Sequence, residues 1–136
     1  MKKTIFILML LLSISLSLNA ETMWYKAYKY NYHTKNMSTG KWNDWDKWHK
    51  CDVDVKIDTD KEIVVIYSNK TQTYRITEYV TALDDVKGGS QIKMKIIDQD
   101  GDKGDLRLRV DKNDVLQIYI DFSNVTWVYC VRIVDE

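Results

Sequence analysis

Apolar and charged residues alternate with a period of two over much of this chain, as in segments 53–58, 92–96 and 106–111. Successive side chains of a β-strand point to opposite faces, whereas a helix repeats its apolar residues about every 3.6 positions. Each segment therefore predicts a strand with aliphatic side chains on one face and charged side chains on the other. Such half-buried strands are typical of antiparallel sheets.

Short polar breaks separate these segments. Most breaks hold only a few residues, such as Asn69-Lys70 and Ser123-Asn124, and only 81–90 forms a longer loop. Short connections join consecutive strands as hairpins. We therefore predict an all-β fold, an antiparallel meander of about eight strands that forms a closed barrel or a rolled sandwich. The predicted strands are 24–32, 53–58, 63–67, 74–80, 92–96, 106–111, 116–122 and 125–134.

In each alternating segment, every second residue is apolar, and these apolar residues should form the core. Burying one aliphatic side chain contributes about 1.5–3 kcal/mol, so these positions hold much of the expected stability. The predicted core residues are Val53, Val55, Ile57, Ile92, Met94, Ile96, Leu106, Leu108, Val110, Leu116, Ile118 and Ile120.

The first twenty residues have the layout of an export signal. Lys2 and Lys3 precede an apolar stretch over 5–18, and Leu18-Asn19-Ala20 offers a small residue at the cleavage point. The apolar stretch is shorter than the roughly 20 residues that a membrane-spanning helix needs. We therefore expect a cleaved signal peptide over 1–20, a single all-β domain over 21–136 and no stable membrane anchor. The mature protein would lie in the periplasm, at the cell surface or in the extracellular space.

The charge of the mature chain argues against a nucleic-acid partner. Without Lys2 and Lys3, 18 basic residues remain against 20 acidic residues, which is a net charge of −2. Nucleic-acid binding needs a basic footprint. The partner expected for such an exported domain is therefore a protein or a glycan.

Cys51 and Cys130 are the two cysteines of the chain. In an exported protein an even cysteine count favours a disulfide. The bond would join the last predicted strand to the start of the second one. In a meander, only closure or rolling of the sheet brings these strands within the Cα separation of about 4.4–6.8 Å that a disulfide requires. We therefore expect the disulfide and the closed architecture together.

Three tryptophans, Trp42, Trp45 and Trp48, are spaced by three residues before the second predicted strand. Tryptophan offers a flat apolar face with one hydrogen-bond donor, so an exposed cluster would form a platform for a sugar or a peptide. Because tryptophan is usually mostly buried, we expect the cluster to close one end of the barrel instead. If exposed, these three residues are the candidate binding surface.

Asp98, Asp100 and Asp102 match the first three acidic positions of an EF-hand calcium loop. Lys103 and Arg109 stand where that loop needs glycine and glutamate, so the segment is a weak metal candidate and a hairpin turn is its expected role. Neither histidine has a metal-ligand spacing, and no serine lies in a nucleophile motif. We therefore expect no enzyme activity, no cofactor and no dedicated metal site.

Gly40-Lys41-Trp42 with Arg132 superficially resembles the lipocalin signature, in which G-x-W opens the first strand and an arginine follows late in the chain. Here a predicted strand, 24–32, precedes the tripeptide. Barrels of this strand number can hold one small ligand. The resemblance implies a lipocalin-like barrel that carries a small apolar ligand.

A second resemblance rests on the tryptophan cluster and on segments 63–68, 72–74, 97–101, 106–109, 117–120 and 127–129. On these segments, which cover most of 24–131, the chain resembles short uncharacterised exported β-proteins of gut bacteria and their tailed phages. The function of that group is unknown. The resemblance therefore implies an exported setting and transfers no activity, substrate or catalytic residue.

The function expected from the sequence is a small exported binding or interaction module at the cell envelope or outside the cell. Its contact surface would be the tryptophan region or the strand edges. The alternative is the barrel that carries a small apolar ligand. A cavity inside the barrel would favour the carrier, and a filled core with exposed tryptophans would favour the module.

Exported material should begin at Glu21, because the signal layout places the cleavage after Ala20. Intact-mass measurement of the exported protein checks this. A mass that still includes residues 1–20 would contradict cleavage and favour a membrane anchor.

Overall fold

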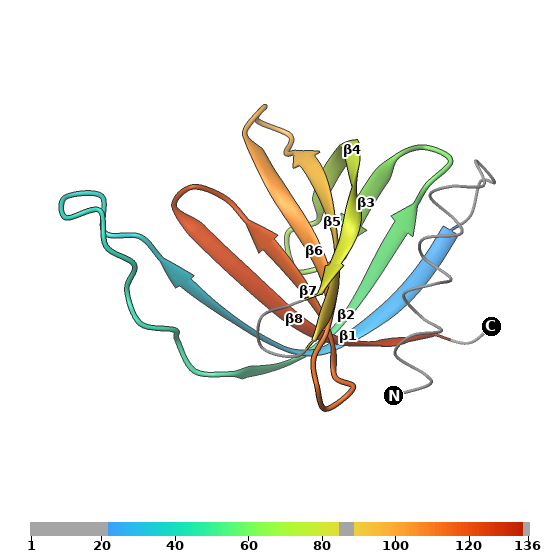
Figure 1. Cartoon of the computed structure of the whole chain (residues 1–136), viewed down its shortest axis with the longest axis horizontal. Coiled ribbons are helices and arrows are strands. Elements are labelled where there is room, and N and C mark those ends of the chain that lie inside the picture. The colour runs from blue at the N-terminus through green and yellow to red at the C-terminus, as the bar shows by residue number, and fades with distance from the viewer. Residues whose placement is uncertain (1–21, 85–88, 135–136) are drawn as a thin grey trace.

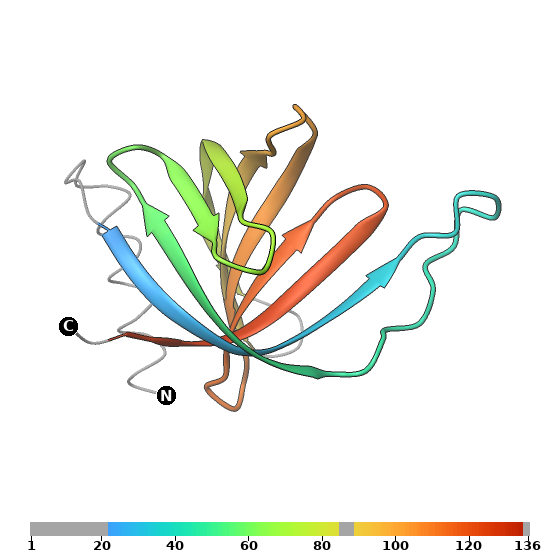
Figure 2. The same ribbon diagram turned by 180° about the vertical axis from the view of Figure 1, so that it is seen from behind.

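The computed structural model describes residues 22–84 and 89–134, with the backbone alone for 81–84. These residues form eight antiparallel strands that pair in sequence order and close into a barrel (Figure 1). Figure 2 shows the same barrel from behind. The predicted all-β meander is thus confirmed, in its closed form. The strands are β1 (Thr22–Thr34), β2 (His49–Asp58), β3 (Ile63–Ile66), β4 (Gln72–Asp84), β5 (Ser90–Ile97), β6 (Lys103–Val110), β7 (Leu116–Asp121) and β8 (Val125–Ile133).

The strand ends differ from the predicted ones mainly in two places. β2 begins at His49 rather than at 53, and β4 continues to Asp84. The long connection predicted over 81–90 is therefore shorter, and its residues 85–88 lie outside the described part of the chain. The predicted signal peptide lies outside it too. Within the described part, no helix is long and apolar enough to cross a membrane.

Pairing between β1 and β8 closes the barrel. Tyr25 lies opposite Ile133 at one end of this pairing, and Thr34 lies opposite Val125 at the other. β1 also pairs with β2, so it joins the first hairpin to the last strand. Backbone hydrogen bonds between the first and last strands remove the two sheet edges that an open meander would expose.

A bulge at Tyr28 reverses the two faces of β1. The register shifts between Ala27 and Lys29 against both neighbouring strands. A bulge adds one residue to a strand whose side chains alternate with a period of two, so the inward positions change parity across it. Tyr25 and Tyr30 therefore both face the core.

Aliphatic and tyrosine side chains fill the middle of the barrel. All twelve predicted core residues face it, and Val53 is the only one of them that is partly rather than fully buried. The predicted core is therefore confirmed. The other buried members are Tyr25, Ala27, Val64, Ile66, Tyr74, Ile76, Tyr129 and Val131.

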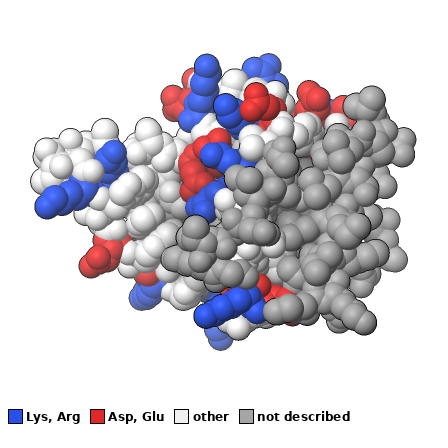
Figure 3. All heavy atoms as spheres, viewed as in Figure 1, with Lys and Arg blue, Asp and Glu red and all other residues white. Residues whose placement is uncertain are grey.

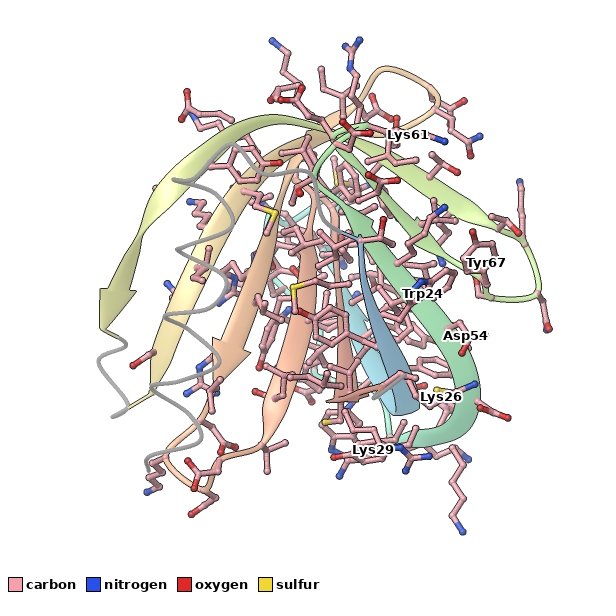
Figure 4. All side chains as sticks on the ribbon, turned by 90° about the vertical axis from the view of Figure 1, so that its right-hand side faces the viewer. Trp24, Lys26, Lys29, Asp54, Lys61 and Tyr67 are labelled. Carbon is pink, nitrogen blue, oxygen red and sulfur yellow. The ribbon has the colours of Figure 1, made fainter. Side chains whose placement is uncertain are left out.

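The outer face of β1 and β2 carries ion pairs and a ring stack (Figure 4). Lys26 Nζ lies 2.9 Å from the Asp52 carboxylate and 2.6 Å from that of Asp54, and these hydrogen bonds raise the pKa of Lys26. Trp24 stacks on Tyr67 with ring centroids 6.0 Å apart. Exposed pairs of this kind add little to stability, so the filled core and the closed ladder hold the fold.

The predicted disulfide is absent, since Cys51 and Cys130 are both free thiols. β1 lies between β2 and β8, so two strand spacings of ~4.8 Å separate the two backbones, which is beyond disulfide reach. The two side chains also lie on opposite faces. Cys51 packs against the core, whereas Cys130 lies on the outer wall, where its Sγ accepts a hydrogen bond from Gln117. Closure needs no cross-link because the β1–β8 pairing supplies it.

Ile118→Ala should destabilise the protein by about 2–5 kcal/mol, because Ile118 is fully buried and its truncation leaves a cavity. Val134→Ala is the control: Val134 is 40% exposed, and its truncation should cost less than about 0.5 kcal/mol. Denaturant unfolding measures both. An Ile118→Ala protein as stable as the parent would mean that the strand register is wrong.

Protein purified without reductant should carry two free thiols. Iodoacetamide should modify the half-buried Cys51 in the native protein and the buried Cys130 only after unfolding. Burial raises the pKa of both thiols, which slows the reaction at neutral pH because the thiolate is the nucleophile. Mass spectrometry counts the labels. If neither thiol is labelled in denaturant without reductant, the disulfide exists after all.

Candidate binding groove

Residues 35–48, called the tryptophan arm below, leave the end of β1 and return to the start of β2. Figure 1 shows the arm extending away from the barrel. Backbone hydrogen bonds tie its returning leg to β1: Asn43 N donates to Thr34 O at 2.8 Å, and Asp46 N donates to Tyr32 O at 2.9 Å. The arm therefore continues the first hairpin beyond the barrel.

The three tryptophans of the arm are exposed. Trp42, Trp45 and Trp48 keep 42%, 44% and 45% of their surface accessible. The expectation that they close one end of the barrel is therefore wrong. Inward-facing rings, among them Tyr30 and Trp127, line that end instead. An exposed cluster of large apolar side chains is typical of a binding surface.

Stacking contacts hold the tryptophans against β1. His33 stacks on Trp45 with ring centroids 3.9 Å apart and on Trp42 at 4.6 Å. Lys29 Nζ lies 4.7 Å from the ring centroid of Trp48. Because these partners belong to a strand of the barrel, the rings have defined positions. Side chains that are already ordered lose less entropy when a ligand binds.

A hydrogen bond anchors the point where the arm joins β2. His49 Nε2 lies 2.7 Å from Asp46 Oδ2, and this hydrogen bond lowers the pKa of Asp46. The imidazole of His49 also stacks on Tyr30, with ring centroids 5.0 Å apart. The arm is thus attached to the barrel through both of its legs.

The outer wall beside the arm contains a straight row of side chains from four strands. Arg107 on β6 lies opposite Tyr119 on β7, and Tyr119 lies opposite Val128 on β8. Val128 in turn lies opposite Asn31 on β1. All four point outward, because a chain neighbour of each faces the core. The row crosses the β8–β1 junction and therefore exists only in the closed barrel.

This row and the arm line a groove of about 570 Å³, called the wall groove below. Trp45 and Trp48 contribute from the arm, and Arg107 and Arg109 contribute from β6. The volume lies within the range of small-ligand sites. The described residues that line the groove are Asn31, Trp45, Trp48, Arg107, Arg109, Tyr119 and Val128.

Hydrogen bonds orient both arginines of the wall groove. Arg107 donates through Nε and Nη2 to the Asp121 carboxylate at 2.6 and 3.1 Å, and its guanidinium carbon lies 4.2 Å from the Tyr119 ring centroid. Arg109 Nη1 donates to Gln117 Oε1 at 3.0 Å. Burial raises the pKa of Tyr119, so its hydroxyl stays neutral. The groove therefore presents fixed donors rather than mobile charges.

Buried polar side chains support the wall. Asn31, Gln117 and Thr126 are 5%, 9% and 7% exposed, although they face outward from the barrel. Asn31 Oδ1 accepts a hydrogen bond from Tyr32 N at 2.8 Å, and Thr126 Oγ1 donates to Asp121 at 3.2 Å. Satisfied polar networks of this kind hold the groups above them in place.

The acidic segment predicted as a weak metal candidate forms the β5–β6 turn. Asp98 Oδ1 accepts hydrogen bonds from Asp100 N at 2.9 Å and from Asp102 N at 2.8 Å. Gly101 has a φ of +88°, which favours glycine. Among the side chains that the structure describes, those of 22–80 and 89–134, no group of three or more His, Cys, Asp or Glu residues could hold a metal ion.

The two parts of the lipocalin-like signature lie apart. Trp42 pairs with Lys35 inside the arm, whereas Arg132 lies opposite Lys26 toward the other end of β1. Gly40, with a φ of +72°, belongs to the turn of the arm rather than to the start of a strand. The structure therefore does not assemble that signature into a site.

Sequence reasoning identified the tryptophans but missed Arg107 and Arg109 as site residues. Their alternation with leucines predicts only an outward, solvated strand face. The one available signal is that two arginines share this face two positions apart. Nothing in the sequence places them beside Trp45 and Trp48, since that depends on closure through β8 and β1.

Charged side chains of both signs are interspersed on the described part of the face seen in Figure 3, in line with the near-balanced charge of the chain. Comparison with protein-family models, curated proteins and solved structures found no match. The resemblance to short exported proteins of gut bacteria and their phages therefore stays a prediction.

Proposed function

We propose that this protein is a binding module that acts at the cell envelope or outside the cell and takes an acidic carbohydrate in the wall groove. The observation that carries the proposal is the meeting of Trp45 and Trp48 with Arg107 and Arg109 in one groove. The exported setting rests on the signal layout of residues 1–20. The proposal includes no catalytic step.

The aromatic side chains favour a ligand with a flat apolar face. Trp45 and Trp48 expose large ring surfaces, and Tyr119 adds a third ring to the groove. A sugar ring presents an apolar face of C–H groups with hydroxyls around its edge. Aromatic rings offer area for the face, and fixed donors such as Asn31 suit the hydroxyls.

Charge sets the class of sugar. The described lining of the groove contains two guanidinium groups and no carboxylate, and Asp121 lies beside Arg107 just outside it. Arginine binds carboxylates and sulfates through parallel N–H bonds. A uronic acid supplies both a ring face and a carboxylate, so it is the ligand class that fits the groove.

The filled interior favours this module over the alternative carrier. Tyr25, Leu108 and Ile118 in the middle of the barrel are 0% exposed. A small apolar ligand held in the centre of the barrel would have to displace such side chains. The exposed tryptophans and the filled core together are the combination that the module requires.

Oligogalacturonate should bind the mature protein and change its tryptophan fluorescence, because two tryptophans line the groove. A neutral galacto-oligosaccharide of the same length should bind about tenfold more weakly, since it lacks the carboxylates that accept charge-assisted hydrogen bonds. Isothermal titration calorimetry measures both affinities. Equal affinities for the two oligosaccharides would contradict the proposed ligand class.

Trp48→Ala and Arg109→Gln should each weaken oligogalacturonate binding about fivefold or more. Lys61→Gln is the matched control, because Lys61 lies in the exposed β2–β3 turn, at the end of the barrel opposite Lys29 (Figure 4). The Lys61→Gln variant should bind oligogalacturonate with the affinity of the parent. Unchanged binding by both groove variants would place the ligand elsewhere.

A further inference from the structure

A second pocket opens where β3 is too short to cover β2. β2 begins at His49, but its pairing with β3 ends at Val55 opposite Ile66. The first residues of β2 therefore have no partner on β3, which leaves a gap beside them. The β3–β4 turn lies on the other side of this gap. A pocket of about 580 Å³, called the mouth pocket below, occupies this gap and the adjoining end of the barrel.

Three aromatic side chains from inside the barrel line the mouth pocket. Tyr30 comes from β1, and Trp127 and Tyr129 come from β8. The ring centroid of Tyr30 lies 6.1 Å from those of both other rings, so the three form one cluster. Gln72 Nε2 donates to the Tyr129 hydroxyl at 3.4 Å, and burial raises the pKa of that hydroxyl. The inner part of the pocket is therefore aromatic and uncharged.

The rim of the mouth pocket carries positive charge. Lys50 lines it from β2, and Lys70 lines it from the β3–β4 turn across the gap. Asp52 is the single carboxylate among the described lining residues, and Lys26 Nζ lies 2.9 Å from it. Lys26 is shared with Asp54, which lies 2.6 Å from its Nζ, so Lys26 offsets the charge of Asp52 only in part, and its hydrogen bond lowers the pKa of Asp52. The two rim lysines outnumber the one rim carboxylate, which leaves a net positive charge at the entrance.

We propose that the mouth pocket is a second binding site, which takes a small ring-bearing organic anion. The ring would lie among Tyr30, Trp127 and Tyr129, and the anionic group would lie toward Lys50 and Lys70. Barrel mouths are frequent ligand sites, and the compact ammonium group of lysine pairs with carboxylates and sulfonates alike. The described linings of the two pockets share no residue, so this site is independent of the wall groove.

Two dyes with the same rings test the proposal. 8-Anilinonaphthalene-1-sulfonate carries an anionic group, and N-phenyl-1-naphthylamine lacks it. Fluorescence titration should show one site for the anionic dye. The neutral dye should bind about fivefold more weakly, because it cannot form the two exposed charge pairs with Lys50 and Lys70. Equal affinities would overturn the requirement for an anion.

The double variant Lys50→Gln with Lys70→Gln should bind the anionic dye about fivefold more weakly than the parent does. It should bind the neutral dye with the affinity of the parent. Both lysines are exposed, so the variant should melt at the parent temperature. Trp48→Ala should leave dye binding unchanged, because Trp48 lines only the wall groove. A double variant that binds the anionic dye as the parent does would overturn the proposal.

Cys51 gives a second readout, because its side chain lines the mouth pocket. Saturating anionic dye should slow the alkylation of Cys51 by iodoacetamide about fivefold or more, measured at pH 8.5, near the ordinary pKa of a thiol. Cys130 is buried on the outer wall, so we expect no labelling of it in the folded protein. An unchanged rate at Cys51 would place the dye elsewhere and overturn the site.

Discussion

Backbone pairing between β1 and β8 is the constraint on which the rest of this structure depends. It joins the last strand to the first, so the outward residues of β6, β7 and β8 continue onto β1 and toward the tryptophan arm. In an open meander, the row that begins at Arg107 would end at Val128, and Asn31 would lie on the far edge of the sheet. The wall groove is therefore a consequence of closure rather than of any one segment.

The bulge at Tyr28 separates the two candidate sites. Beyond it, Tyr30 points into the barrel and lines the mouth pocket, whereas Asn31 points outward and lines the wall groove. A shift of one residue in a strand moves each side chain to the other face. Without the bulge, the second half of β1 would present Tyr30 to the outer wall and Asn31 to the barrel mouth, and neither site would form.

The strands and the core could be predicted because they depend on local alternation, as in Leu106, Leu108 and Val110 on β6. The bulge could not, because β1 carries aromatic residues at both parities and no alternation marks the change of face. The disulfide prediction failed because export and an even cysteine count say nothing about which face a side chain occupies. Cys51 and Cys130 lie on opposite faces of the barrel wall. The tryptophans were identified as candidates, but the arginines that meet them come from strands distant in sequence.

The indole N–H groups of the five tryptophans provide the most direct test of the wall groove. In a nitrogen–proton correlation spectrum, oligogalacturonate should shift the indole resonances of Trp45 and Trp48, which line the groove. The resonances of Trp24, on the outer face near the start of β1, and of Trp127, at the barrel mouth, should stay in place. Shifts confined to Trp127, or no shifts at saturating oligosaccharide, would contradict the assignment of the wall groove as the carbohydrate site.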